Sequence, residues 1–442
     1  MENIFYLILL ILFIFASNNY DYSSYIATSI NKNLFGNTLK STNSDESVVY
    51  INNSEIIIQN SILEKTSGNS SNTKTSNLYG INSALLVNGG NANISGSTIS
   101  TAVNGANAVF ATNKGNITIT GSKISSFASS SAGGLYATNG GTINAKNVNI
   151  TSNGTSSPSL ATDINKGTIT CIGCLLSTKG SRSPLIYSIG NIDVIGSKGF
   201  AQRSQMVVVD GQNTVTIRGN SNLKCTGFGQ KRNNSENSGI ALLHTDFEGC
   251  DDVKNTIFNC KHSSMEIISA SPVYKSAPMF FVKNADVLLN LENCKFRYGS
   301  GVFLDIRTTA FRDHYKGAFV TMTITNQYIE GDFVVDTNSS LSINLINSTI
   351  IGKINNNKVH TIVAILIDAA SSIVLTGDSY ISHLTNEDET LSNIKKGPYI
   401  LADFTGYEFH GINLTNLKSN NTSSHNYLYV AYYLLIILLL LL

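Results

Sequence analysis

The sequence predicts an all-β fold, a parallel β-helix with three short strands per coil. The first observation is a motif in which two alternating apolar positions, a two-residue kink and two further alternating positions recur through residues 83–190. A fixed period in this range indicates stacked supersecondary units. The second position of the motif recurs every 25 to 26 residues, at Ile94, Ile119, Ala145 and Cys171.

The second observation is a further apolar tract that keeps the same period, at residues 109–112, 135–138, 159–162 and 185–188. Alternating apolar residues indicate strands with one buried face, and the Gly, Asn and Ser between them suit tight corners. No window between the strands has the apolar spacing of a helix. Each strand is therefore expected to pair directly with its own copy in the next coil, as in a solenoid.

The same motif extends on both sides of this block and predicts about twelve coils. Several steps between coils are longer than the basic period, and these coils are expected to carry side loops, the largest between Ile217 and Cys260. The predicted second positions, which should form one buried row, are Ile58, Ile94, Ile119, Ala145, Cys171, Val194, Ile217, Cys260, Leu291, Ile324, Leu345 and Leu375.

The ends of the chain differ from the repeats. Residues 1–17 contain an apolar run and are interpreted as a signal peptide, with an uncleaved anchor as the alternative. Residues 18–47 are a polar leader expected to cap the first coil, and residues 48–404 form the β-helix. The polar stretch 405–426 is a stalk, followed by the apolar tail 427–442. This pattern predicts membrane attachment through a glycolipid (GPI) anchor at Asn421, or else through a tail span.

Five segments resemble a known group of proteins. They are residues 183–197, 205–219, 277–296, 326–355 and 375–381. These segments resemble uncharacterised, adhesin-like right-handed β-helix surface proteins with an autotransporter-passenger-like, pectin-lyase-like architecture. The resemblance covers about residues 83–400 and implies a right-handed coil. It implies no catalytic motif, because the group has none in common.

Composition restricts the possible partners. Charged residues make up 13% of the chain and the net charge is +1, so no nucleic-acid partner is expected. No sequence motif indicates a cofactor or a metal. The expected partners are cell-surface or cell-wall glycans or proteins, together with the membrane at the C-terminal tail.

Asn-x-Ser/Thr sequons are frequent, as expected of a secreted glycoprotein, although an Asn- and Ser-rich chain also contains many by chance. We expect about half of them to be used. The candidates are Asn52, Asn69, Asn93, Asn116, Asn149, Asn153, Asn233, Asn338, Asn347 and Asn413. Asn420 and Asn421 also stand in sequons, in the polar stalk.

Six cysteines are disulfide candidates, with buried thiols as the alternative state. A metal site is disfavoured because the C-x-x-C pair has no second pair at matching spacing. The cysteines are Cys171, Cys174, Cys225, Cys250, Cys260 and Cys294.

Two enlarged coils concentrate charge. If the protein is an enzyme, the catalytic residues are expected among Asp305, Arg307, Arg312, Asp313, His314 and Lys316. A second charged loop contains His244, Asp246, Glu248, Asp251, Asp252 and Lys254. Charge in a long loop is more often plain solvation, so catalysis is the less favoured interpretation.

Three hypotheses for function follow. The preferred one is a non-enzymatic secreted or cell-surface solenoid that presents loops for adhesion or forms a cell coat. The alternatives are a polysaccharide lyase or glycoside hydrolase of the β-helix type, and a carbohydrate-binding module without turnover. An enzyme should place at least three acids and one base in one groove. A binding module should show a row of exposed tyrosines.

Overall fold

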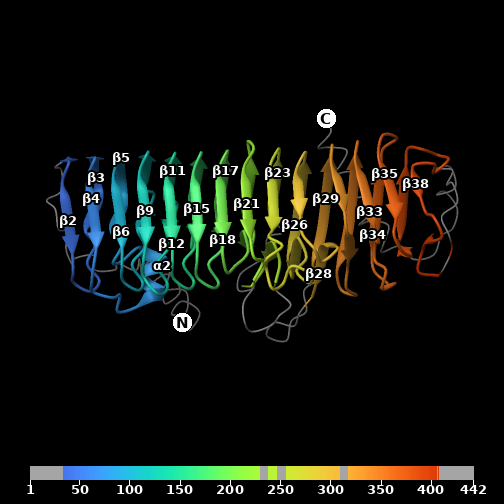
Figure 1. Cartoon of the computed structure of the whole chain (residues 1–442), viewed down its shortest axis with the longest axis horizontal. Helices are drawn as coiled ribbons and strands as arrows, with labels where there is room; N and C mark the ends of the chain where they lie inside the picture. Colours follow the sequence, from blue (N-terminus) through green and yellow to red (C-terminus); the bar gives the residue numbers. More distant parts are fainter. Residues whose placement is uncertain (1–32, 229–236, 246–254, 309–316, 406, 408–442) are drawn as a thin grey trace, which may run out of the picture.

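The computed structural model describes residues 33–228, 237–245, 255–308, 317–405 and 407, and it is built almost entirely from parallel β-strands. The strands stand side by side in one long row, with each strand next to its copy from the neighbouring repeat (Figure 1). This arrangement confirms the predicted all-β parallel solenoid. Expectations about residues 1–32 and 408–442, including the signal peptide, Asn413, Asn421 and the apolar tail, lie outside the described residues.

Three parallel ladders make up the body, named here in the order in which one repeat visits them. The first ladder contains β7 (Val109–Thr112), β10 (Leu135–Ala137), β13 (Leu160–Thr162), β16 (Ile186–Ser188), β19 (Val207–Asp210), β22 (Ile240–Leu243), β25 (Phe280–Lys283), β28 (Val302–Arg307) and β31 (Asp332–Val334). Two longer strands, β3 (Val49–Gln59) and β5 (Leu85–Ser95), run through both the first and the second ladder.

The second ladder contains β1 (Leu34–Phe35), β8 (Asn116–Thr120), β11 (Thr142–Lys146), β14 (Thr168–Ile172), β17 (Asn191–Ile195), β20 (Thr214–Arg218), β23 (Thr256–Lys261), β26 (Asp286–Glu292), β29 (Phe319–Thr325), β32 (Ser340–Ile346), β34 (Val363–Ile367) and β37 (His383–Asn386). Because β1 already pairs with β3, parallel pairing begins at Leu34, ahead of the boundary expected at residue 48.

The third ladder has two parts. Its ten-stranded sheet contains β2 (Thr38–Ser41), β4 (Ile62–Lys65), β6 (Thr98–Thr101), β9 (Lys123–Ser126), β12 (Asn149–Ser152), β15 (Leu175–Thr178), β18 (Lys198–Ala201), β21 (Asn222–Cys225), β24 (Ser264–Ile267) and β27 (Lys295–Arg297). A four-stranded sheet follows, with β30 (Tyr328–Glu330), β33 (Thr349–Gly352), β35 (Ser372–Leu375) and β38 (Ile394–Lys395). Two short strands, β36 (Ser379–Tyr380) and β39 (Leu401–Ala402), pair with each other near the C-terminal end.

The predicted buried row exists in the second ladder and runs without a break from Ile58 to Leu345. Its last predicted member is wrong. Leu345 pairs with Ile367, whereas Leu375 pairs with Gly352 in the third ladder. Ile373-x-Leu375 has the same alternating pattern as the motif, so apolar spacing alone could not distinguish the two ladders.

The two-residue kink between the second and third ladders explains the Asn/Gly-Ser pairs of the motif. Its second residue adopts a left-handed backbone that Gly and Asn tolerate best, as at Gly121 (φ 55°) and Asn347 (φ 48°). The next residue faces inward, and where it is serine its hydroxyl accepts a hydrogen bond from the backbone of the preceding rung. Ser348 Oγ, for example, accepts from Gln327 N at 3.0 Å. The kink thus satisfies buried backbone groups that no ladder can reach.

The one described helix, α2 (Thr73–Tyr79), lies outside the solenoid, in the connection between β4 and β5 (Figure 1). Asn72 caps its N-terminus by accepting a hydrogen bond from Thr75 N at 3.1 Å. Gly80 ends it in the left-handed conformation, and any side chain there would collide with the Phe110 ring. The helix therefore packs closely against the outer face of the first ladder.

Candidate functional site

The outer face of the first ladder carries the most varied chemistry among the described residues. Strand residues alternate between the core and this face. The outward row, taken from one rung to the next, is Tyr50, Leu86, Phe110, Tyr136, Ala161, Tyr187, Val208, Ala241, Phe281, Asp305 and Val334. The row is aromatic or apolar over most of its length and becomes charged at Asp305.

The helix covers the N-terminal part of this row. Tyr50, Leu86, Phe110 and Tyr136 form an apolar cluster that is separate from the solenoid core. Phe110 and Tyr136 stack with their ring centroids 5.7 Å apart. Thr138 Oγ1 donates a hydrogen bond to the carbonyl of Leu78 in α2 at 2.9 Å. This end of the face is therefore closed by the chain itself.

Tyrosines and aspartates alternate over the next four rungs. Tyr136 and Tyr187 lie in the outward row, two rungs apart. Asp163 and Asp210 lie two residues further along their strands, on the rung after each tyrosine. The four side chains therefore form a Tyr–Asp–Tyr–Asp series along the solenoid axis, named here the Tyr/Asp series.

Each member of the Tyr/Asp series is held differently. Asp163 Oδ1 accepts a hydrogen bond from Ile164 N at 2.8 Å. Asp210 accepts from Thr245, at 3.0 Å from the backbone N and 2.6 Å from Oγ1. The Tyr187 hydroxyl is hydrogen-bonded to Asp210. The Tyr136 side chain is 5% exposed, and its hydroxyl has no hydrogen-bond partner among the described residues.

Burial and mutual repulsion shift the titration of these groups. Burial raises the pKa of Asp163 to about 6, and the negative charge of Asp210 raises it further, against the opposing hydrogen bond from Ile164. Burial also raises the pKa of both tyrosines above the usual value of 10, with smaller contributions from Asp163 and, for Tyr187, from Asp210. The series thus concentrates negative charge in a partly desolvated place.

The predicted catalytic loop is only partly described. Asp305 and Arg307 lie on β28 and form an ion pair of 2.6 Å. Burial raises the pKa of Asp305, and Arg307 opposes this shift. Thr308 donates hydrogen bonds from its backbone N and hydroxyl to Asp336, which joins this loop to the next rung. Arg312, Asp313, His314 and Lys316 lie outside the described residues, as do Asp246, Glu248, Asp251, Asp252 and Lys254 of the second loop.

His244 is the one member of the second charged loop that the structure describes. It is buried, and its backbone N donates to the carbonyl of Lys283 at 3.1 Å. His244 therefore continues the ladder pairing beyond β22. The described parts of the two predicted loops supply one acid–base pair, short of the three acids and one base expected of an enzyme.

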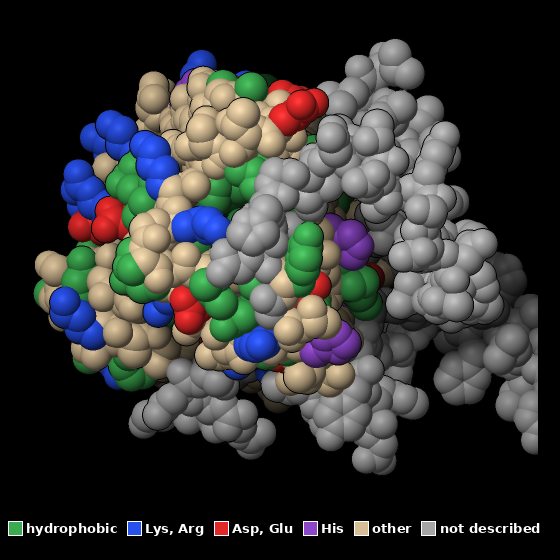
Figure 2. All heavy atoms as spheres, turned by 90° about the vertical axis from the view of Figure 1, so that its right-hand side faces the viewer, with side chains coloured by type: hydrophobic (Ala, Val, Ile, Leu, Met, Phe, Trp, Pro, Cys, Tyr) green, Lys and Arg blue, Asp and Glu red, His purple; other side chains and the backbone are tan. Residues whose placement is uncertain are grey.

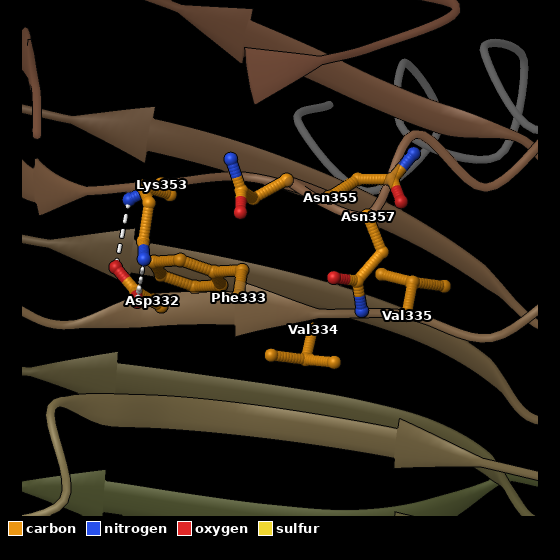
Figure 3. Close-up of a pocket in the computed structure, with 8 residues that line it drawn as sticks. Asp332, Phe333, Val334, Val335, Lys353, Asn355 and Asn357 are labelled. Carbon is orange, nitrogen blue, oxygen red and sulfur yellow. Dashed lines mark hydrogen bonds and ion pairs between the residues drawn. The ribbon is translucent and has the colours of Figure 1, made fainter. Parts of the chain in front are cut away.

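A small pocket of about 110 Å³ lies near the C-terminal end of the same face, between β31 and the residues after β33 (Figure 3). Lys353 reaches across it to Asp332, with a nitrogen–oxygen distance of 3.1 Å. Asn355 donates to the carbonyl of Val359 at 2.9 Å. The pocket has room for a few water molecules, and its main polar side chains already have partners within the chain.

The outer face of the second ladder provides the contrast. Its middle row consists mainly of threonine and asparagine, and Asp193, the charged member, forms an ion pair of 2.8 Å with Arg218. Amides bridge successive rungs, as where Asn290 Nδ2 donates to Asn259 Oδ1 at 2.9 Å. From Asn93 to Asn344 the uncharged members are Asn93, Thr118, Asn144, Thr170, Thr216, Asn259, Asn290, Thr323 and Asn344. Apolar residues stand on either side of this stretch, Ile57 before it and Leu366 after it.

Most sequons lie on the surface. Asn52, Asn69, Asn93, Asn149, Asn338 and Asn347 are exposed, while Asn116 and Asn153 are half-buried. Asn233 lies outside the described residues. Exposure alone does not leave the side-chain amide nitrogen available for glycosylation. The amide nitrogen of Asn347, for example, already donates a hydrogen bond to Asn326 Oδ1 at 2.7 Å.

Two disulfides connect the same two inward rows. Cys171 and Cys174 are joined within one coil, whereas Cys260 and Cys294 join neighbouring coils. Cys225 is a buried free thiol, the alternative state expected for these cysteines, and it pairs along its ladder with Ala201 and Ile267. Burial raises the pKa of Cys225 to about 12, so the thiol is not ionised at neutral pH. Cys250 lies outside the described residues.

Within the described part of the chain, no three His, Cys, Asp or Glu side chains are arranged to hold a metal ion. No helix in that same part is long and apolar enough to cross a bilayer. At the C-terminal end of the solenoid, Lys and Arg side chains lie among acidic and uncharged ones (Figure 2).

Comparison with protein families, with curated proteins and with solved structures finds no match for this chain. The case for function therefore rests on the residues themselves. The Tyr/Asp series does not follow from the repeat motif, because the motif defines inward positions and these four side chains face outward. The signal was present as Tyr136, the second residue of the tract at 135–138, and Tyr187, the third residue of the tract at 185–188. Asp163 directly follows the tract at 159–162, and Asp210 ends the next apolar run after Tyr187.

Proposed function

We propose that this protein is a non-enzymatic binding solenoid of the cell surface, adhesin-like, that contacts extracellular glycans through the outer face of its first ladder. The observation that carries the proposal is the Tyr/Asp series. It combines the half-buried ring of Tyr187, two carboxylates and the hydroxyl of Tyr136 on one face of a rigid body. Rings that pack on sugar C–H groups and carboxylates that accept from sugar hydroxyls are the usual components of a saccharide site.

The proposal includes a right-handed parallel β-helix of about twelve coils. Its support is the continuous register of the second ladder together with the resemblance of residues 183–197 and 326–355 to right-handed β-helix surface proteins. A rigid ladder with insertions at its corners is a common way to present binding residues. Loops of this kind can change without disturbing the scaffold.

The proposal also places the protein outside the cell, with residues 1–17 removed as a signal peptide and attachment through the region of Asn421. The apolar composition of residues 4–15 and 427–442 supports this location. A phosphatidylinositol-specific phospholipase should then release the protein from intact cells. Retention on the membrane, with peptide 427–442 still detectable by mass spectrometry, would indicate a tail span instead.

A glycan array tests the binding function. The secreted protein should bind a limited set of saccharides, and Tyr187→Ala should abolish that binding while leaving the circular dichroism spectrum unchanged. Thr170→Ala, on the outer face of the second ladder, is the matched control and should bind like the unmodified protein. Failure to bind any saccharide on the array would reject the proposal.

The second candidate is a glycan-cleaving enzyme, which the elevated pKa of Asp163 beside Asp210 favours. Two carboxylates on one face, one of them with a raised pKa, are an arrangement that glycoside hydrolysis uses. The Tyr/Asp series itself contains two acids and no basic side chain. A reducing-sugar release assay on the saccharides that bind decides the question, because turnover that depends on Asp163 would make the protein an enzyme.

A further inference from the structure

The Tyr/Asp series repeats every two rungs, and this spacing restricts its ligand. Rungs of a parallel solenoid are about 4.8 Å apart, so like members of the series are separated by about 9.6 Å along the axis. The tyrosines and the aspartates share this spacing and are offset by one rung. A ligand that contacts all four side chains must lie along the axis and repeat on the same scale.

This spacing disfavours an extended peptide. Side chains on one face of a β-strand recur every two residues, or about 6.7 Å, which does not match two rungs. An extended chain of β-linked hexoses has a disaccharide unit close to two rungs in length. It also offers a flat C–H face to the half-buried ring of Tyr187.

Charge indicates which hexose is favoured. Asp163 is half-buried and has no ion pair among the described residues. The nearest lysine in sequence, Lys166, donates instead to the carbonyl of Gln212 at 3.2 Å. Burial and the charge of Asp210 raise the pKa of Asp163, so its ionised form is under-stabilised. A cationic ligand would supply the missing partner, and a neutral one would not.

The Tyr136 hydroxyl also favours a ligand beside Asp163. It is attached to a side chain that is 95% buried, and it lacks a hydrogen-bond partner in the described structure. The hydroxyl oxygen is not among the fully buried unpaired atoms, so it stays accessible to solvent and a ligand atom can replace water on it. The half-buried ring of Tyr187 also favours a bound ammonium group through cation–π attraction.

We propose that the Tyr/Asp series binds a β-linked polymer of amino sugars through their free ammonium groups. Asp163 and Asp210 receive ammonium groups two rungs apart, Tyr187 packs against the sugar ring between them, and the Tyr136 hydroxyl bonds to the sugar before Asp163. This assignment rests on the proposed glycan-binding function and specifies its ligand. It predicts selectivity for the free amine over the N-acetylated sugar.

Isothermal titration calorimetry of the secreted protein at pH 7 tests the assignment, with a glucosamine hexamer and its fully N-acetylated counterpart as probes. The free-amine hexamer should bind at least tenfold more tightly. Asp163→Asn should weaken its binding about tenfold, because the carboxylate is replaced by a neutral group of the same shape. Tyr136→Phe, which removes only the hydroxyl, should weaken it several-fold.

The matched control is Asp193→Asn, which removes a carboxylate of equal charge from the outer face of the second ladder. This variant should bind like the unmodified protein. Three results would overturn the assignment: equal affinity for the acetylated hexamer, equal loss in the Asp193→Asn variant, or equally tight binding of hexalysine. If the glucosamine hexamer fails while the glycan array finds another ligand, the ligand assignment falls and the glycan-binding function stands.

Discussion

The outer faces of the first and second ladders share one scaffold and differ in nearly everything they present. On the first, aromatic rings and aspartates are partly buried, and the pKa of Asp163 is raised. On the second, threonine and asparagine predominate, and Asp193 is paired with Arg218. Neighbouring strands of the same rung carry both faces. The inward residues therefore determine the fold, and the outward residues can change independently of it.

The largest effect is expected from placing an aspartate on the inward side of a strand, compared with placing it on the outward side. Ile119 is fully buried in the second ladder, and its neighbour Thr118 faces outward and is exposed. Ile119→Asp should prevent folding, because an unpaired buried carboxylate costs several kcal/mol. Thr118→Asp should fold with nearly unchanged thermal stability. Secretion yield and circular dichroism measure both variants, and normal secretion of the Ile119→Asp variant would contradict the assigned register.

The disulfides allow a finer comparison between two positions within the same inward rows. Removing the bridge between Cys260 and Cys294, which are separated by 34 residues, should lower stability by about 3–4 kcal/mol on chain-entropy grounds. Replacing Cys171 by Ala and Cys174 by Val should cost at most about 2 kcal/mol, because the bridge closes a short loop. Those replacements copy Ala145 and the buried Val148 of the preceding coil.

Chemical denaturation of the two double variants measures this difference. Cys260→Ala with Cys294→Ala should show the larger decrease in midpoint. An equal decrease in both variants would mean that the bridge between coils adds nothing beyond the bridge within a coil.

Periodicity made the inward half of this structure predictable. The buried row from Ile58 to Leu345 follows directly from the repeat, because each inward position must match its neighbours above and below. Leu375 was assigned to the wrong ladder, since two ladders share the same alternation. The interval between the true partners Leu345 and Ile367 is also shorter than the repeat of residues 83–190. The repeat length therefore could not identify Ile367 as the partner in place of Leu375.

The candidate site was harder to predict because outward residues are not constrained by packing. Tyr136, Asp163, Tyr187 and Asp210 become neighbours only when four rungs are stacked in register. Sequence analysis instead favoured the charge-rich loop that contains Asp305 and Arg307. Charge density marks solvated segments more often than sites, and the described part of that loop forms one ion pair and joins the next rung through Thr308.

Lys65 is an exception to the rule that inward positions are apolar. The pH dependence of the free energy of unfolding measures how well the fold stabilises its buried ammonium group. Its side chain is 1% exposed, and its ammonium group donates to Ser41 Oγ at 3.1 Å, to the carbonyl of Glu46 at 2.7 Å and to the carbonyl of Asn43. Burial lowers the pKa of Lys65 to about 8 from its usual 10.5, although Glu46 and Asp45 oppose the shift. The unfolded chain therefore binds more protons than the folded chain between pH 8 and 10.5.

The free energy of unfolding should consequently rise with pH across this window, by roughly 2 kcal/mol relative to a Lys65→Met variant that lacks the titrating group. Urea denaturation at pH 8, 9 and 10 of both proteins gives this difference directly, and tyrosine ionisation cancels because both proteins contain the same tyrosines. Parallel pH dependence in the two proteins would show that the Lys65 ammonium is as well stabilised in the folded chain as in water.

The smallest effect is expected at the corner between the first and second ladders. Lys283 pairs with Arg307 and Asp286 pairs with Phe319, so ladder pairing continues on both sides of the insertion that follows β28. Replacing residues 309–316 with two glycines should shift the melting temperature by less than about 2 °C, because loop length contributes little to stability. Thr308 is retained because it donates to Asp336. The same variant should bind saccharides like the unmodified protein if the Tyr/Asp series is the site. Loss of binding with unchanged stability would move the site from the outer face of the first ladder to the charged loop.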